Sequence, residues 1–586
     1  MRRTATALAI AVPVALILGT IPSASAGPVP MADARAKSGG TLRILATSES
    51  LEMDPSAIYE SDALAVAAAF TTRTLVTYPQ SGTLTSAVVP DLATTTGTSS
   101  AGATIWSFTL REGMTFEDGT PITCADVKYG VSRSFDERYV SVGPSLARDL
   151  LDIPRDPLTQ GSTYLGPWNA SPANNRSAFN SAVSCSPNKR TITFRLNQPR
   201  SDFREIVTLP IFAPVQRDLD EGADWNTAPQ STGPYRVVAS TSTSITLARN
   251  PAWFSAIDPV RPAYPDSVII SLGLDSASIE QRLKNDAGTD RTAVSLDALT
   301  GLTARSITSV AADGAATYGS RTISGGRPFV RYLSINTASV PTLAARRAIA
   351  AGLDRQGILG SASKQWPSGG TTVAGTLADG LIPPAVGSAA RATGLWTTLL
   401  GKSIPEDGDP GYACTLLKRA GITRLQLTID FPDYDGSLGK TIAGVVEQSL
   451  ERCSRIRVTQ KPIDWMSFYA TIGDPAQRAS MTPLGWGLDL PTAPTVIEPL
   501  LGSTGSFNFT GLASTAIDDE ITYAYEAVNP VQQASKWAAL NRKAVGQAWY
   551  IPLYWERQVH LVGSKLRGAA ISPATGRLNL GGIWIS

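Results

Sequence analysis

The residue types that usually carry out catalysis are scarce in this chain. His560 is the single histidine among 586 residues, so a Ser-His-Asp hydrolase would depend on it alone. It lies in an apolar alternating run, Tyr554 to Val562, that is typical of a strand. The motifs of serine hydrolases, zinc proteases, P-loop enzymes and Cys/His zinc sites do not occur in the sequence. We therefore do not expect an enzyme, and a secreted hydrolase is kept as an alternative.

One acidic segment, Asp433-Tyr434-Asp435-Gly436, has the spacing of half a calcium-binding loop. The downstream oxygen ligands that would complete such a loop are missing from the sequence that follows. Because Asp and Gly in this arrangement are also typical of turns, a turn is the favoured interpretation. The sequence predicts no metal site and no cofactor.

The composition is that of an ordinary globular protein, with 43% hydrophobic and 17% charged residues. A chain of 586 residues exceeds the size at which a single core stops growing, so two or more lobes are expected. Lys and Arg number 51 against 49 Asp and Glu, which gives a formal charge of +2 without a long basic run. Nucleic-acid binding depends on positive charge and is therefore not expected.

The N-terminal segment has the three parts of a secretory signal peptide. Arg2 and Arg3 precede an apolar run, and Ala24-Ser25-Ala26 provides a small-residue cleavage site. We assign residues 1–26 to this peptide and residues 27–38 to a flexible leader. No later stretch approaches the roughly 18 apolar residues of a membrane-spanning helix, so an exported, water-soluble protein is expected.

A strand, a turn and a helix are predicted in close succession. Trp106, Phe108 and Leu110 alternate with smaller residues, which places bulky apolar side chains on one face of an extended segment. A turn rich in acidic residues and glycine follows. Thr123 with Asp126 three residues later then has the pattern of a capped helix N-terminus.

The character of the chain changes between its two halves. The first half is strand-rich, with alternation at Thr191 to Pro199 and at Ser244 to Asn250. Within it, residues 156–184 are rich in Pro, Asn, Ser and Gly and are expected to form a surface excursion outside the core. Beyond residue 330, helical and strand patterns alternate, which predicts a mostly parallel sheet covered by helices.

The segment from Trp106 to Arg133 closely resembles the signature of the family 5 solute-binding proteins of ABC importers, the group that includes the dipeptide and oligopeptide receptors. Further blocks of the chain resemble the family in the family's own order. These blocks are Gly39 to Arg43, Ser231 to Phe254, Ser334 to Leu359, Gly485 to Pro491 and Ala548 to Val562.

The resemblance implies an α/β, two-lobed fold of the periplasmic-binding-protein type (type II, cluster C) with an extra subdomain inserted in lobe I. The chain would cross between the lobes near Phe329 to Ile335 and near Pro552 to Tyr554. Mapped on this sequence, lobe I comprises residues 39–80, 225–333 and 551–586, the inserted subdomain residues 81–224, and lobe II residues 334–550.

The same resemblance guides the expected disulfides. It places Cys414 and Cys453 together in lobe II, where we pair them, and this leaves Cys124 to pair with Cys185. An exported protein can oxidise its cysteines, although four buried thiols are the alternative. Many Gram-positive relatives carry a lipidated cysteine directly after the signal peptide, but this chain has no cysteine before Cys124. A lipoprotein is therefore not expected.

Asp489 is the strongest candidate for a ligand contact. In peptide-binding relatives, the acid of a W-x-A-D motif meets the ligand's α-ammonium group, and Trp486 and Asp489 have the matching spacing here. A carboxylate in a closing cleft needs a partner once water leaves, and a peptide amine supplies one. The alternative is that Asp489 caps a turn or pairs with an internal arginine.

Several aromatic residues are weaker candidates, and all but Tyr59 have a packing alternative. Tyr59 follows the first strand, where relatives often face the cleft, and Tyr332 lies at the expected lobe crossing, where it would otherwise pack in the hinge. Trp486 is either a cleft wall or a packing anchor. Trp465 and Tyr469 lie four residues apart on a predicted helix, for which core packing is favoured.

Arg327 and Arg331 are candidates for pairing with a ligand carboxylate, and an inter-lobe salt bridge is equally compatible with their positions. Together these expectations describe a receptor that closes on a small solute and presents it to the transmembrane subunits of an ABC permease. A peptide is the first choice of ligand and an oligosaccharide the second. A non-transport cell-wall protein reusing the fold is the other alternative. We expect a monomer in the periplasm or cell-envelope zone.

Overall fold

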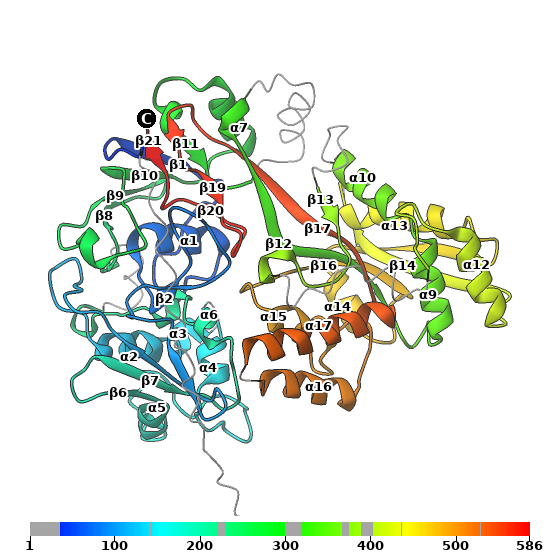
Figure 1. The fold of residues 1–586 in the computed structure, drawn as a ribbon, viewed down its shortest axis with the longest axis horizontal. Helices are drawn as coiled ribbons and strands as arrows, with labels where there is room; N and C mark the ends of the chain where they lie inside the picture. The colour runs from blue at the N-terminus through cyan, green and yellow to red at the C-terminus, as the bar shows by residue number, and fades with distance from the viewer. Residues whose placement is uncertain are drawn as a thin grey trace, which may run out of the picture.

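The computed structural model describes residues 35–140, 143–220, 229–298, 318–365, 374–387, 402–434, 436–527 and 529–586. The expected signal peptide and most of the leader lie outside these residues. Figure 1 shows two bodies joined by two long strands, β12 (Thr322–Ile335) and β17 (Tyr550–Leu561). Within the described residues, no helix is long and apolar enough to cross a membrane.

Lobe I is built on a five-stranded sheet with the order β11-β1-β10-β9-β8. Strand β1 pairs in parallel with β10 and β11, and β9 pairs antiparallel with both β10 and β8. The strands are β1 (Thr41–Leu45), β8 (Tyr235–Ser240), β9 (Ser244–Arg249), β10 (Ser267–Ser271) and β11 (Ala293–Ser295), accompanied by helices α1 (Ser61–Val66) and α7 (Ser276–Asn285).

Three small antiparallel pairs accompany the lobe I sheet. One pair comes from the early part of the chain and two come from its C-terminal part, and the C-terminal strands lie beside the N-terminal ones in the same lobe (Figure 1). The pairs are β2 (Val76–Thr77) with β3 (Val89–Pro90), β18 (Leu566–Arg567) with β21 (Trp584–Ile585), and β19 (Ala570–Ile571) with β20 (Leu578–Asn579).

A four-stranded antiparallel sheet, β4-β5-β7-β6, forms a separate layer beside lobe I. It confirms the alternation at Trp106, Phe108 and Leu110, whose side chains are all buried. The strands are β4 (Thr98–Ser100), β5 (Ile105–Thr109), β6 (Val183–Cys185) and β7 (Thr191–Arg195), and the helices are α2 (Cys124–Arg133), α3 (Glu137–Val140), α4 (Leu146–Leu150), α5 (Arg176–Ala182) and α6 (Phe203–Ile206).

The expectation that residues 156–184 form a surface excursion is wrong in part. Tyr164 and Phe179 stack with ring centroids 4.4 Å apart, and both pack against Phe135 in the core. The polar composition of the segment hid these two aromatic anchors, which supply enough apolar area to hold α5 against the sheet.

Lobe II contains a six-stranded sheet with the order β13-β17-β12-β16-β14-β15. The sheet is mixed and not mostly parallel as predicted: β14 pairs in parallel with β15 and β16, whereas β12 pairs antiparallel with β16 and β17. The antiparallel half arises because the two crossing strands enter the lobe in opposite directions. The remaining strands are β13 (Gly375–Leu377), β14 (Leu425–Asp433), β15 (Ile456–Asp464) and β16 (Met481–Gly487).

Helices cover this sheet and form a second helical layer beyond its edge (Figure 1). The alternating helical and strand patterns of the second half are confirmed at α9 (Leu343–Gly352), α12 (Pro410–Arg419) and α13 (Leu438–Leu450). The helices are α9 (Leu343–Gly352), α10 (Arg355–Gln365), α12 (Pro410–Arg419), α13 (Leu438–Leu450), α14 (Phe468–Gly473), α15 (Pro494–Leu501), α16 (Thr515–Tyr525) and α17 (Pro530–Gly546).

The two long strands change lobe within their own length. Near its start β12 packs Ile323 against the lobe I core, and near its end it buries Leu333 and Ile335 in lobe II. The register between β12 and β17 shifts between Gly326 and Val330. A bulge of this kind bends a strand and leaves residues without ladder partners, so the bend is concentrated at the crossing.

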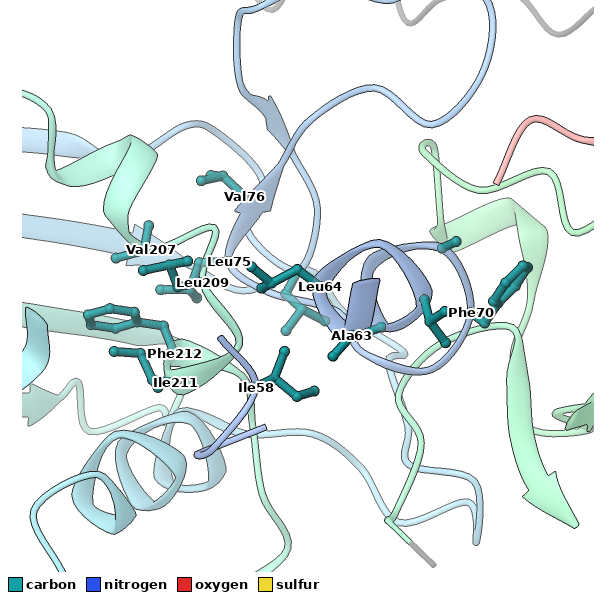
Figure 2. Close-up of a cluster of buried hydrophobic side chains, with 14 of the residues drawn as sticks. Ile58, Ala63, Leu64, Phe70, Leu75, Val76, Val207, Leu209, Ile211 and Phe212 are labelled. Atoms are coloured by element: carbon teal, nitrogen blue, oxygen red, sulfur yellow. The ribbon is translucent and has the colours of Figure 1, made fainter. Parts of the chain in front are cut away.

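A compact apolar cluster fixes the start of α1, which is important for the site described below. Ile58, Ala63 and Leu64 lie opposite Leu209 and Ile211 (Figure 2), and all five are buried. Because α1 is only six residues long, this packing and not helix propensity holds it in place. The residues between Ile58 and Ala63 are thereby presented at the lobe surface.

Both expected disulfides are present. Cys124 is bonded to Cys185 and Cys414 to Cys453, with Cα atoms 5.9 and 5.5 Å apart. The first joins the start of α2 to β6, and the second joins α12 to the turn after α13. Each disulfide therefore links two segments of the same lobe, and neither disulfide restricts movement of one lobe against the other.

The predicted capping of α2 is confirmed and can be tested. Asp126 Oδ2 accepts hydrogen bonds from both the backbone N–H and the hydroxyl of Thr123, each at 2.7 Å. Asp126→Ala is expected to lower the free energy of unfolding by about 1 kcal/mol. Urea unfolding measures the change, and Asp152→Ala at an exposed position controls for loss of a surface charge. An equal loss in both variants would contradict the capping role.

Candidate functional site

A cavity of about 510 Å³ lies where the two lobes meet. Its wall combines the start of α1, the end of β11, the crossing region of β12 and β17, the loop after β16 and the turn between β19 and β20. These segments come from five distant parts of the sequence, and only the fold brings them together. The cavity is large enough to hold a small organic ligand.

Asp489 lies on the loop after β16 and faces this cavity. Its Oδ1 atom accepts a hydrogen bond of 2.7 Å from the Tyr59 hydroxyl, which comes from the segment before α1. Burial and the neighbouring carboxylate of Asp489 raise the pKa of Tyr59, so the phenol stays protonated and donates. The bond joins lobe I to the loop that leaves the lobe II sheet.

The Asp489 loop is held by its next residues. Leu490 is buried in the lobe I core cluster although it follows a lobe II strand. Pro491 lines a smaller cavity of about 60 Å³ together with Leu64 and Arg577. Because apolar burial fixes Leu490, the Asp489 carboxylate is positioned with little freedom of its backbone.

Two further carboxylates, Asp62 on α1 and Asp297 after β11, line the same cavity. Burial and, after it, the charge of Asp297 raise the pKa of Asp62 to about 6, against the opposing effect of Arg577. Asp297 is oriented by the Thr47 backbone N–H, which donates to Oδ2 at 2.9 Å. The cavity therefore holds negative charge at two places, at Asp489 and at this pair.

His560 on β17 closes one side of the cavity and is itself buried. Its Nδ1 atom lies 3.3 Å from the Ser295 carbonyl oxygen, so Nδ1 carries the proton and donates. Burial lowers the pKa of His560 to about 4, which keeps the ring neutral. A triad base would bond Nδ1 to a carboxylate and Nε2 to a nucleophile, and His560 has the backbone carbonyl instead.

Arg577 lines the cavity with these acids and lowers the pKa of Asp62 through its charge. Its Nε atom donates to the Ser61 hydroxyl at 3.0 Å. Burial lowers the pKa of Arg577 to about 10, although the charges of Tyr78, Asp62 and Asp489 oppose this effect. The guanidinium remains charged at neutral pH and partly balances the carboxylates around it.

Residues 87–508 match the family model described as bacterial extracellular solute-binding proteins, family 5. The chain belongs to this family. The match confirms the family predicted from the sequence, and the mixed α/β architecture confirms the two-lobed fold class. A search of the curated proteins finds no match.

Solved structures share this fold over nearly the whole chain. The clavulanic acid biosynthesis oligopeptide binding protein 2 is 26% identical, with 94% of this chain and 96% of that chain covered and a TM-score of 0.78. The murein tripeptide binding protein MppA, in its unliganded open form, is 17% identical with coverage of 94% and 98% and a TM-score of 0.71. DppA from Helicobacter pylori, in complex with peptide STSA, is 16% identical with coverage of 94% and 98% and a TM-score of 0.61.

In this family 5 protein, Arg327 and Arg331 both bind Glu556 on β17. Arg327 Nη1 lies 2.9 Å from Glu556 Oε2 and Arg331 Nε lies 2.6 Å from Oε1. Both arginines therefore form salt bridges between the two crossing strands, at the bulge, and pairing with a ligand carboxylate stays a prediction. Arg327 also lines the cavity, so its guanidinium faces the ligand space while paired with Glu556.

Three aromatic candidates lie outside the lining of this cavity, and their contact with a ligand stays a prediction. Tyr332 is fully buried and packs against Tyr550 with ring centroids 5.2 Å apart. Trp486 Nε1 donates to the Thr495 carbonyl at 2.6 Å, as a packing anchor would. Trp465 precedes α14 and is 60% exposed, so the favoured core packing of this residue is wrong.

Sequence reasoning missed the residues that give the cavity its charge: Asp62, Asp297 and Arg577. Asp62 lies three residues after Tyr59, so the expectation that this segment faces the cleft pointed to its neighbourhood. Asp297 and Arg577 belong to short connections without a motif, and no local signal distinguishes them from surface residues. His560 was considered only as a catalytic base, not as a wall of a binding cavity.

A second contact joins the lobes away from the cavity. Arg200 forms a buried ion pair with Asp202, and its guanidinium lies over the Tyr525 ring of α16 at 4.5 Å. Thr492, just beyond the Asp489 loop, has its hydroxyl 3.5 Å from Asp202 Oδ2. The loop after β16 therefore contacts lobe I at two places, through Leu490 in the lobe I core and through Thr492 at Asp202.

Proposed function

We propose that this protein is an exported receptor of an ABC importer that captures a peptide between its lobes and delivers it to a membrane permease. The observation that carries the proposal is the Asp489 carboxylate, which faces a cavity bounded by both lobes. Among the described residues, the hydrogen bond from Tyr59 engages one of its oxygens. The other oxygen is available to the α-ammonium group of a peptide.

The energetics of closure favour a charged partner at this position. An ionised carboxylate loses hydration as the cleft closes, and this costs several kcal/mol unless a cation takes the place of water. A peptide ammonium supplies the charge together with N–H donors. Ligand binding would therefore favour the closed arrangement through contacts that the open arrangement does not make.

The crossing strands are suited to act as the hinge. The register shift between Gly326 and Val330 leaves Arg327 and Pro328 without ladder partners, and Phe329 keeps a partner only in β16, at Gly487. Bending there would change few hydrogen bonds, while the disulfide of each lobe keeps that lobe rigid. The closing motion is a population shift about these residues.

The alternatives receive less support. Among the described residues, Tyr59 and Phe329 line the cavity and no tryptophan does, so stacking platforms for an oligosaccharide are few. The buried, neutral His560 lacks the partners of a hydrolytic base. Peptide-binding proteins are also among the solved structures that resemble this chain. A cell-wall protein without transport activity would show no solute binding at all.

A thermal-shift screen of the mature protein against peptide and sugar libraries tests the proposal. A ligand present at about 100 times its Kd is expected to add about 2.7 kcal/mol to the free energy of unfolding. Peptides with free amino termini should produce the shift and should be recovered unchanged by mass spectrometry. Shifts by sugars alone, recovery of cleaved peptide, or no shift with any solute would overturn the proposal.

A further inference from the structure

A second set of polar side chains lines the cavity, and the proposed contact with the peptide ammonium does not use it. Asp62 and Asp297 come from α1 and from the end of β11, and their charges interact. His560 lies on the adjoining strand β17 and lines the same cavity. We call Asp62, Asp297 and His560 the cleft floor.

His560 makes this group more than an acidic cluster. Its side chain is 1% exposed, and Nε2 has no hydrogen-bond partner among the described residues. Because Nδ1 donates to the Ser295 carbonyl, Nε2 carries the lone pair and can only accept. A buried acceptor without a partner costs about 1 to 3 kcal/mol, so a ligand donor at Nε2 would remove that cost.

The charges around the cavity indicate what kind of donor fits. Four carboxylates line it, at Glu60, Asp62, Asp297 and Asp489, against two arginines. Arg327 is already paired with Glu556, which leaves Arg577 as the cation among these acids. A zwitterionic peptide with uncharged side chains brings no net charge, so closure over it would leave carboxylates without counter-charge.

We propose that the cleft floor is a second cation subsite, and that the ligand is a peptide carrying a lysine- or arginine-like side chain. The α-ammonium group pairs with Asp489, while the side-chain cation lies between Asp62 and Asp297 and donates an N–H to His560 Nε2. This inference rests on the proposed function, because it specifies the peptide class that the same cleft selects.

Matched peptides test the subsite. Alanine tripeptides with one lysine at the first, second or third position are compared with the same peptides containing Nε-acetyl-lysine, which keeps the side chain but removes its charge. Isothermal titration calorimetry is expected to show that lysine at one position binds about 10- to 100-fold more tightly than its acetylated counterpart. Equal binding of both members at every position would overturn the subsite.

Two conservative variants locate the effect. Asp62→Asn and Asp297→Asn remove charge but keep an acceptor oxygen, which for Asp297 still serves the Thr47 N–H. The double variant is expected to lose the preference for lysine, which is read as the ratio of the affinities for the lysine peptide and its Nε-acetyl-lysine counterpart. Thermal unfolding without ligand checks that the double variant is folded. If the double variant is unstable, the same peptides are compared on Asp62→Asn alone. A preserved lysine preference in a folded variant would overturn the assignment.

The pH dependence gives an independent readout. Asp62 faces Glu60 on its own segment, Asp297 from β11 and Arg577 from the turn before β20, and its pKa is about 6. A cation binds the ionised carboxylate, so affinity for the lysine peptide should rise from about pH 5 to about pH 7 and then level off. Asp62→Asn and the acetylated peptide should both abolish this rise. A rise that persists in Asp62→Asn would contradict the role of this carboxylate.

Failure of the proposed function is distinguishable from failure of the subsite. If peptides bind but those with lysine bind no more tightly than those with Nε-acetyl-lysine, the peptide-receptor function is kept and the cation subsite is rejected. If no peptide binds, the peptide function falls, and the diamine cadaverine becomes the probe. Greater thermal stabilisation of the wild type than of the double variant by cadaverine would support the subsite, and equal stabilisation would reject it.

Discussion

Asp489→Asn is expected to weaken binding of free-amine peptides by about 100-fold, because it removes the charge that pairs with the α-ammonium group in a closed cleft. The substitution keeps an oxygen that accepts the hydrogen bond from the Tyr59 hydroxyl, whose length is 2.7 Å in the wild type. Loop position and fold should therefore be unchanged. Isothermal titration calorimetry with one peptide in its free and N-acetylated forms measures the effect.

The acetylated peptide is the decisive control for this prediction. It lacks the ammonium group, so its affinity should be low for the wild type and nearly the same for Asp489→Asn. Tyr59→Phe removes only a neutral donor to Asp489 and should change the affinity for the free-amine peptide less than Asp489→Asn does. Equal losses for both peptide forms in Asp489→Asn would reject ammonium pairing.

Arg261→Met is expected to lower the free energy of unfolding by about 3 to 5 kcal/mol, because it leaves buried carboxylates without part of their counter-charge. Arg261 Nη2 lies 2.8 Å from Asp91 Oδ2, and Arg261 Nη1 lies 3.3 Å from Asp258 Oδ2. Arg73 Nε pairs with the other oxygen of Asp91 at 2.8 Å. All four side chains are at most 2% exposed.

This buried network also supports the binding cleft. Arg261 Nε donates to the Ala68 carbonyl at 2.7 Å, directly after the helix that carries Asp62. Burial alone would raise the pKa of Asp258, but Arg261 and Arg73 outweigh this and lower it. A carboxyl with a lowered pKa stabilises the fold above the unfolded pKa of about 4, and the stabilisation is lost as pH falls through the folded value.

Urea unfolding of Arg261→Met measures the loss. Arg155→Met is the matched control, since Arg155 and its partner Asp149 are 44% and 48% exposed, and it should cost less than about 1 kcal/mol. Adding Asp258→Leu to Arg261→Met removes the unpaired carboxylate and is expected to recover part of the stability. A loss in Arg261→Met no larger than in Arg155→Met would show that the network does not hold lobe I.

Predictions that depended on local chemistry were confirmed by the structure. The strand at Trp106 to Leu110 and the capped start of α2 follow from alternation and from one capping pair, both of which act within a few residues. The disulfides were predicted through the family resemblance, and both pairings are present. The strand that contains His560 was also predicted from its alternating pattern.

Predictions that depended on long-range arrangement were less accurate. Alternating helices and strands do not report strand direction, so the antiparallel entry of β12 and β17 was missed and the lobe II sheet was expected to be mostly parallel. Trp465 was assigned to the core because aromatic residues at helical spacing usually pack inward, but the helix begins only at Phe468. The domain boundaries stay predictions.

By itself, the sequence determined the family, the scarcity of catalytic groups and the candidate acid Asp489, because these depend on residue types in short ordered motifs. The tertiary structure decided which charges meet. Asp62, Asp297, His560 and Arg577 line one cavity with Asp489 only because the crossing strands, α1 and the C-terminal turn converge there. Each of these side chains has an ordinary local sequence, and its role arises from burial and neighbouring charge, which depend on contacts between residues hundreds of positions apart.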